Sequence, residues 1–240
     1  MKFYDRVGCE LSDIEDFIKL YEPSYFLGGD KIPGVSQSSC FVEKKIEDIL
    51  FTTGIREQLH VVQILAWKIG KIKHGESESA SEFRYAKDWD RAKDFDVTRY
   101  GRRFDIEKIA NYMVKNITDL EREAKTNPQN VLDKLNQNGI WGLGSVYLVT
   151  LLYFISKGRY PIYDRFAMMA VDAILNSTKP GGIVLCRKLP GKVEKGFSTT
   201  MQDHIQPYMK KLEDIFGSEY QCTRDIDRAL WVYGHLFKVR

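Results

Sequence analysis

Two features of the chain could do chemistry: a glycine turn and an aspartate at the start of a helix. The turn reads Gly142-Leu143-Gly144, and Asp164 follows Gly144 by twenty residues. Glycines let main-chain N–H groups approach a phosphate closely, and the N-terminus of a helix beginning at Ser145 favours anions. A carboxylate such as that of Asp164 can stabilise a developing positive charge or take a proton from water.

Apolar helices must position both features. The stretch from Ser145 to Ser156 is nearly all apolar, which is typical of a helix through the centre of a helical domain. A short turn with Lys157 and Arg159 follows it, and Pro161-Ile162-Tyr163 leads into Asp164 and a second predicted helix over 165–176. The order is therefore glycine turn, helix, basic turn, aspartate and helix.

This order and spacing resemble the helix-hairpin-helix superfamily of base-excision DNA glycosylases, which includes adenine glycosylases and 8-oxoguanine glycosylase-like folds. The resemblance covers residues 139–172. In that family the glycine turn grips a DNA phosphate, and an aspartate at the next helix start acts on a base flipped out of the duplex. The resemblance implies a DNA-repair hydrolase that cleaves the N-glycosidic bond of a damaged or mismatched base, with Asp164 catalytic.

DNA is the partner that the resemblance implies. Main-chain N–H groups of the turn, with Leu143 packed beneath it, and basic side chains near the two helices would contact DNA phosphates. The implied phosphate-binding residues are Gly142, Leu143, Gly144, Ser145, Lys157, Arg159 and Arg165.

The chain departs from the family pattern in two ways. Bifunctional relatives carry a Schiff-base lysine two positions after the second glycine, where this chain has Val146, so base removal by water without an enzyme–DNA imine is expected. Only Cys186 and Cys222 follow the motif, too few for the iron–sulfur cluster that many relatives hold. No cofactor or metal is expected, although the resemblance allows a monovalent cation at the hairpin.

Simpler interpretations stand beside these. The glycine turn could merely join two packed helices, and Asp164 could be an ordinary helix N-cap. The chain could then be a non-catalytic nucleic-acid or nucleotide-binding protein that keeps the fold, or an unrelated helical interaction protein. Asp225 and Asp227 are expected to form surface ion pairs, and the four histidines, which lack metal-ligand spacing, are given no role.

Composition sets broad limits on the chain. With 240 residues and 43% hydrophobic content it can bury a full core, and a net charge of +3 permits DNA binding without demanding it. The four cysteines form no CxxC pair, which disfavours a zinc site and fits a reducing compartment. No apolar stretch is long enough to cross a membrane. We therefore expect a cytoplasmic monomer.

Hydrophobic periodicity predicts an all-α fold, and the resemblance implies one glycosylase-like helical unit over residues 1–240 that could divide into two lobes. One lobe would hold about residues 1–103 with the C-terminal helices, and the other about residues 104–178 with the hairpin. Residues 75–103 carry seven basic and seven acidic side chains among aromatic ones, and they are expected to form an irregular solvated loop or lid. Residues 183–195 could form a small β-hairpin within a basic stretch, 179–195, which could contact phosphates or be a soluble loop.

Overall fold

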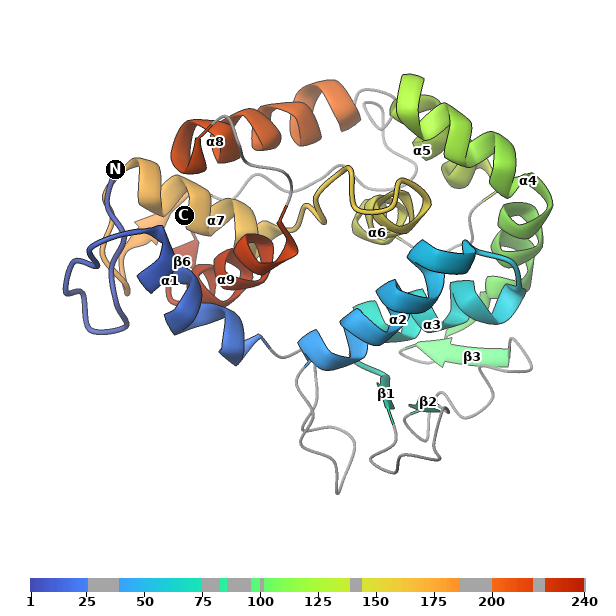
Figure 1. The fold of residues 1–240 in the computed structure, drawn as a ribbon, viewed down its shortest axis with the longest axis horizontal. Coiled ribbons are helices and arrows are strands. Elements are labelled where there is room, and N and C mark those ends of the chain that lie inside the picture. Colours follow the sequence, from blue (N-terminus) through green and yellow to red (C-terminus); the bar gives the residue numbers. More distant parts are fainter. Residues whose placement is uncertain are drawn as a thin grey trace. The chain divides into compact units, whose positions relative to one another are not determined.

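The protein folds into two compact units. The computed structural model describes residues 1–25, 39–74, 83–85, 96–99, 102–138, 144–185, 200–217 and 223–239. One unit joins the two ends of the chain, Met1–Tyr25 and Gly158–Arg240, and the other comprises Phe26–Lys157 (Figure 1). Residues 26–103 thus group with the helices that follow residue 104 and not with the C-terminal helices, so the unit boundaries differ from those expected from sequence.

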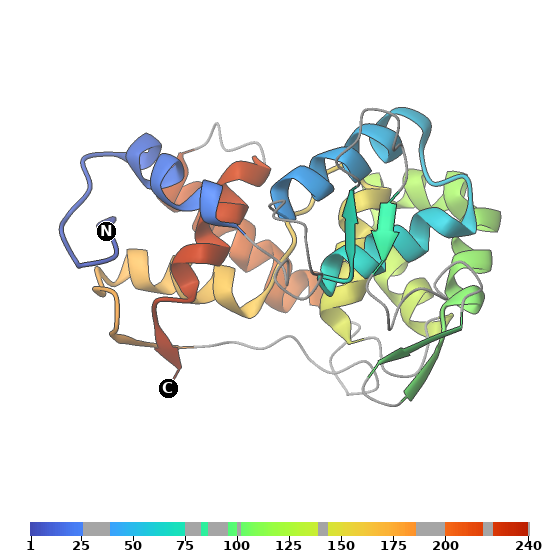
Figure 2. The same ribbon diagram turned by 90° about the horizontal axis from the view of Figure 1, so that it is seen from below.

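The unit that holds the chain ends is built on α9 (Arg224–Gly234). This helix packs against α7 (Arg165–Leu175) and α1 (Ile14–Tyr21), as Figure 2 shows. Aromatic rings of α1 and α9 pack against one another. The centre of the Tyr233 ring lies 5.3 Å from that of Phe17 and 5.0 Å from that of Tyr21. A 3-10 turn follows α1, and a π-helical turn precedes α8 (Gln206–Phe216), which also contacts α7.

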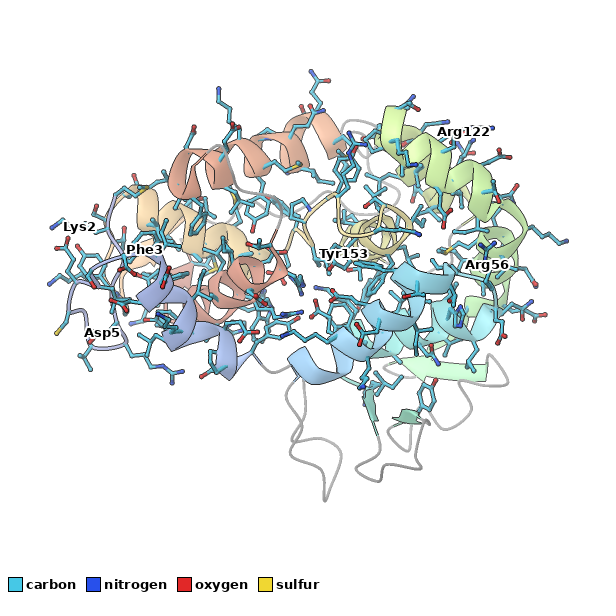
Figure 3. All side chains as sticks on the ribbon, viewed as in Figure 1. Lys2, Phe3, Asp5, Arg56, Arg122 and Tyr153 are labelled. Carbon is cyan, nitrogen blue, oxygen red and sulfur yellow. The ribbon has the colours of Figure 1, made fainter. Side chains whose placement is uncertain are left out.

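The second unit surrounds α6 (Ser145–Ile155). Four helices contact it: α2 (Ser39–Thr53), α3 (Gln58–Lys68), α4 (Ile106–Thr126) and α5 (Pro128–Gln137). Tyr153 on α6, labelled in Figure 3, donates its hydroxyl hydrogen to Glu47 on α2. Nine of the eleven residues of α6 are buried, which confirms that this apolar segment is a central helix.

The helices predicted over 145–156 and 165–176 agree with α6 and α7 to within one residue at each end. Asn127 caps α5 by accepting a hydrogen bond from the N–H of Asn130 at 3.2 Å, and Pro128 occupies the first helical position, where it needs no donor. Asp13 caps α1 in the same manner at 2.8 Å from the nitrogen of Asp16. The mostly helical class is confirmed.

The expected irregular segment around residues 75–103 contains strands, so that expectation is wrong in part. Strand β1 (Ile72–His74) pairs antiparallel with β2 (Phe83–Tyr85), and β3 (Asp96–Arg99) pairs antiparallel with β4 (Arg102–Asp105). Only two residues separate β3 from β4, which is the spacing of a tight hairpin. Cross-strand pairing stabilises these short runs where charge counts alone predicted a solvated loop.

Of the predicted hairpin at residues 183–195, the structure describes only residues 183–185, which include a strand. That strand, β5 (Ile183–Val184), pairs in parallel with β6 (Lys238–Val239) at the end of the chain. Residues 186–195 of the predicted hairpin, with most of the basic stretch, lie outside the described residues. The partner that the structure shows for β5 is thus a distant segment, which a local turn pattern cannot indicate. Within the described ranges, no helix is long and apolar enough to cross a membrane.

Candidate active site

Asp164 is the N-cap of α7. Its backbone is extended, with φ −139° and ψ 170°, and its carboxylate Oδ1 accepts hydrogen bonds from the N–H groups of Phe166 at 2.9 Å and Ala167 at 3.1 Å. The residue is 9% exposed. Two fixed donors orient the carboxylate at the positive end of the helix dipole, a place that stabilises a negative charge.

The segment before Asp164 is held rigidly. The N–H of Tyr163 donates to the carbonyl of Pro161 at 3.0 Å, which makes a tight turn centred on Ile162. Ile162 and Tyr163 are both buried, and the Tyr163 ring packs edge-on against Tyr208 with ring centres 5.1 Å apart. The backbone that delivers Asp164 is therefore fixed by packing as well as by its own turn.

A second carboxylate, Asp227 of α9, lies behind this segment. It is 2% exposed, and it accepts hydrogen bonds from the Ile162 N–H at 3.1 Å and the Tyr208 hydroxyl at 2.9 Å. An ion pair with Arg224 at 2.8 Å completes its surroundings. Burial raises the pKa of Asp227, Arg224 and Tyr208 oppose that rise, and the nearby charge of Asp164 adds to it. The two carboxylates therefore belong to one electrostatic cluster.

The ion pairs expected at the start of α9 are confirmed. Asp227 pairs with Arg224, and Asp225 pairs with Arg228 at 2.7 Å. Asp227 nonetheless lies in the interior and not on the surface, because its helix face turns toward the segment before α7. The expectation of a surface pair is wrong for this residue.

A stack of aromatic and cationic side chains continues from Asp164. The Arg165 guanidinium lies 4.5 Å from the centre of the Phe166 ring, which in turn stacks on the His235 ring at 3.5 Å with an interplanar angle of 20°. Trp231 lies 4.0 Å from His235 between ring centres. Arg165 and His235 are exposed, and Phe166 and Trp231 are half-buried. Such a surface can bind a planar, electron-rich or anionic group.

We expect His235 to titrate below the usual histidine range. Burial of its ring faces lowers the pKa from 6.5, while the Trp231 carbonyl, 2.7 Å from Nδ1, and the charge of Asp164 oppose the shift. Because the folded state then binds its proton less tightly than the unfolded state, the stability contributed by His235 is present above pH 6.5 and is lost as pH falls through 6.5 toward the folded pKa. An NMR titration of the imidazole measures this directly.

A His235→Phe variant separates this titration from that of His60, whose pKa is also lowered by burial. The wild type should lose more stability than the variant between pH 7 and pH 5, as followed by denaturant unfolding. A His235 pKa at or above 6.5, or equal losses in the two proteins, would contradict the expectation.

The glycine turn is described only at its end. Gly142 and Leu143 lie outside the described residues, whereas Gly144 is the N-cap of α6 with φ −74° and ψ 167°. Apart from Gly144 and its chain neighbours, no described atom lies within 4 Å of the position that a Cβ on Gly144 would take. Neither the backbone angles nor the packing of the described residues requires glycine here, and the space suits the close approach of an external group. Ser145, the first residue of α6, is only 4% exposed, so its hydroxyl is not displayed on the surface.

The basic residues expected on phosphate lie at different places. Lys157 follows the far end of α6, about 16 Å along the axis from Ser145 for eleven residues at 1.5 Å each. Its Nζ donates to the Phe51 carbonyl at 3.2 Å, near the C-terminus of α2, where a cation is favourable. Arg159 is exposed, with its guanidinium 6.0 Å from the Tyr160 ring centre. Of the predicted site residues, Asp164 and Arg165 are adjacent on α7, whereas Gly144 and Lys157 lie at opposite ends of α6.

Three residues near Asp164 were not predicted to belong to the site: Asp227, expected only in an ion pair, Trp231, and His235, given no role. They are spaced by four along α9 and its C-cap, His235, and so lie on one face of the helix. The spacing of this aspartate, tryptophan and histidine is visible in the sequence and predicts a shared helix face. Only the fold shows that this face of α9 lies beside Asp164. No group of three or more potential metal ligands occurs within the described part of the chain.

Comparison of the chain with models of known protein families, with characterised proteins and with solved structures finds no match in any of the three.

Proposed function

We propose that the protein is a monofunctional DNA glycosylase that removes a damaged or mismatched base by water attack, with Asp164 as the catalytic carboxylate. The observation that carries the proposal is the start of α7. There a nearly buried carboxylate is oriented by two backbone N–H groups and lies beside exposed aromatic and cationic side chains. A fixed negative charge can stabilise the oxocarbenium-like sugar that forms as the base departs.

The residues around Asp164 supply complementary interactions. Arg165 can contact a DNA phosphate, and the partly exposed rings of Phe166 and Trp231 can stack on a base. The open N-terminus of α6 at Gly144 offers main-chain donors to a second phosphate. Val146 in the first turn of α6 has no nucleophile, so no covalent imine forms in this mechanism.

A non-catalytic nucleic-acid or nucleotide-binding protein is the second candidate. The capping geometry of Asp164 favours it, because two hydrogen bonds to the first turn of α7 are what an N-cap makes in a protein without chemistry. In that case the aromatic and cationic surface would bind nucleic acid without cleaving it.

A panel of DNA duplexes that each carry one damaged or mismatched base tests the proposal. Incubation with the protein followed by alkali should break the strand at one class of lesion, and omission of alkali should leave it intact. DNA binding without excision across the panel would favour the second candidate. No binding to duplex or single-stranded DNA at low salt would contradict both.

We expect Gly144→Ala to weaken DNA binding without unfolding the protein. Alanine adopts the backbone angles of Gly144, and its methyl group meets open space. If a phosphate approaches this turn, the methyl group should displace it, and loss of a charge-assisted hydrogen bond should lower affinity by about tenfold. Fluorescence anisotropy with a labelled duplex at several salt concentrations measures the change.

The same titrations show whether the lost contact is electrostatic, because the affinity of the wild type should fall more steeply with salt than that of the variant. Thermal unfolding serves as the control for folding, since alanine is a poorer N-cap than glycine by about 0.5 kcal/mol. Equal affinities of Gly144→Ala and the wild type would show that the turn does not bind phosphate.

A further inference from the structure

A buried carboxylate on α9 reaches back to the segment that delivers Asp164. Asp227 Oδ2 accepts hydrogen bonds from the main-chain N–H of Ile162 at 3.1 Å and from Arg224 at 2.8 Å. Oδ1 accepts from the Tyr208 hydroxyl at 2.9 Å. Ile162 is two residues before Asp164 and is the central residue of the turn closed by Tyr163 and Pro161. One side chain thus ties two helices, α8 and α9, to the backbone immediately before the candidate catalytic residue.

Stability alone is a weak reason for a charge in this place. Taking a carboxylate and a guanidinium out of water costs several kilocalories per mole, and apolar replacements of such pairs often leave a protein equally stable. Burial raises the pKa of Asp227, and the neighbouring charge of Asp164 raises it further, so the cluster keeps two acids close together at a cost in free energy. Acids with perturbed pKa values cluster at functional sites, and here the hydrogen bond from the Ile162 N–H joins Asp227 directly to the backbone beside Asp164.

We propose that Asp227 is a positioning residue for Asp164, acting through its hydrogen bond to the Ile162 N–H. A role of Asp227 in catalysis rests on the proposed function. Its role in geometry concerns only the hydrogen bonds by which Asp164 caps α7. The bond fixes where the chain leaves the turn, and so fixes the direction from which the Asp164 carboxylate meets the N–H groups of Phe166 and Ala167. Arg224 donates to the same Oδ2 atom that accepts from Ile162, whereas Tyr208 donates to the other oxygen, Oδ1.

Three variants separate the Ile162 bond from the rest of the cluster. Asp227→Ala removes the acceptor. Asp227→Asn keeps an oxygen that can face Ile162 and Arg224 while its amide donates to the Tyr208 oxygen. Tyr208→Phe is the matched control, because it removes one donor to the same carboxylate and leaves the Ile162 bond in place.

Amide hydrogen exchange reads the geometry without reference to catalysis. In Asp227→Ala, exchange of the Phe166 and Ala167 amides should rise by about tenfold, the factor that loss of a hydrogen bond to a charged group predicts. Val171, in the middle of α7, is the internal control, because general destabilisation accelerates it as well. Asp227→Asn and Tyr208→Phe should leave the Phe166 and Ala167 amides close to wild type relative to Val171.

Base excision provides the second readout. The single-turnover rate should fall by about tenfold in Asp227→Ala while DNA affinity is unchanged, and Tyr208→Phe should keep most of the rate. If the wild type excises no base, the proposed function fails, and amide exchange still decides the positioning claim. Unchanged relative exchange at Phe166 and Ala167 in a folded Asp227→Ala protein would overturn that claim. Should this variant not fold, Asp227→Ser, whose side chain is too short to reach Ile162, takes its place in the same comparison.

Discussion

Asp164→Asn is expected to reduce base excision by orders of magnitude while the protein stays folded. Asparagine caps a helix about as well as aspartate, so the hydrogen bonds to Phe166 and Ala167 can persist and the free energy of unfolding should change by less than about 1 kcal/mol. The substitution removes the negative charge that an oxocarbenium-like transition state needs. Single-turnover cleavage of a lesion-bearing duplex, developed with alkali, measures the rate.

DNA affinity is the control for this variant. It should hold or rise, because the substitution relieves repulsion between the Asp164 carboxylate and DNA phosphates. Asp225→Asn is a matched change in charge on α9, at an exposed carboxylate paired with Arg228, and it should keep the wild-type excision rate. Equal excision by Asp164→Asn and the wild type would show that Asp164 is a helix cap and nothing more.

Gly234→Ala is expected to destabilise the protein strongly. A Cβ at this position would lie 1.9 Å from the carbonyl oxygen of Phe166 and 2.5 Å from its carbonyl carbon, so the first turn of α7 would have to move away from α9. Overpacking against backbone costs about 3 kcal/mol. The same displacement would disturb the stack of Phe166 on His235 beside Asp164. Denaturant unfolding measures the change in stability.

Helix propensity and packing predict opposite changes in stability for Gly234→Ala. Alanine is favoured over glycine within a helix by about 1 kcal/mol, so propensity alone predicts that Gly234→Ala stabilises α9. Gly144→Ala introduces the same methyl group where no described atom lies within 4 Å, and it should cost little. Unchanged or increased stability of Gly234→Ala would mean that α7 and α9 do not approach each other as closely as the structure shows.

Much of the helical framework follows from the sequence. The apolar sequence predicts α6 and α7, and the cap at Asp164 marks the start of α7. Counts of charged residues do not predict the strands near residues 72–105, because they say nothing about pairing between strands. The turn residues after β5 predict a neighbouring strand as its partner, whereas the structure pairs it with β6 at the end of the chain. The unit boundaries were misjudged for a similar reason, since contacts between distant segments define them.

The sequence by itself determined which residues could do chemistry at the start of α7. A helix cap depends on groups within three residues of one another, so Asp164 and its two N–H partners are visible in the order of residues alone. Tertiary structure alone decided what surrounds Asp164. The hydrogen bond from Ile162 to Asp227 joins residues 65 apart in sequence, and the Phe166–His235 stack joins residues still farther apart. Such contacts arise when α7 packs on α9 with the closeness that Gly234 permits, and no local pattern encodes which faces meet.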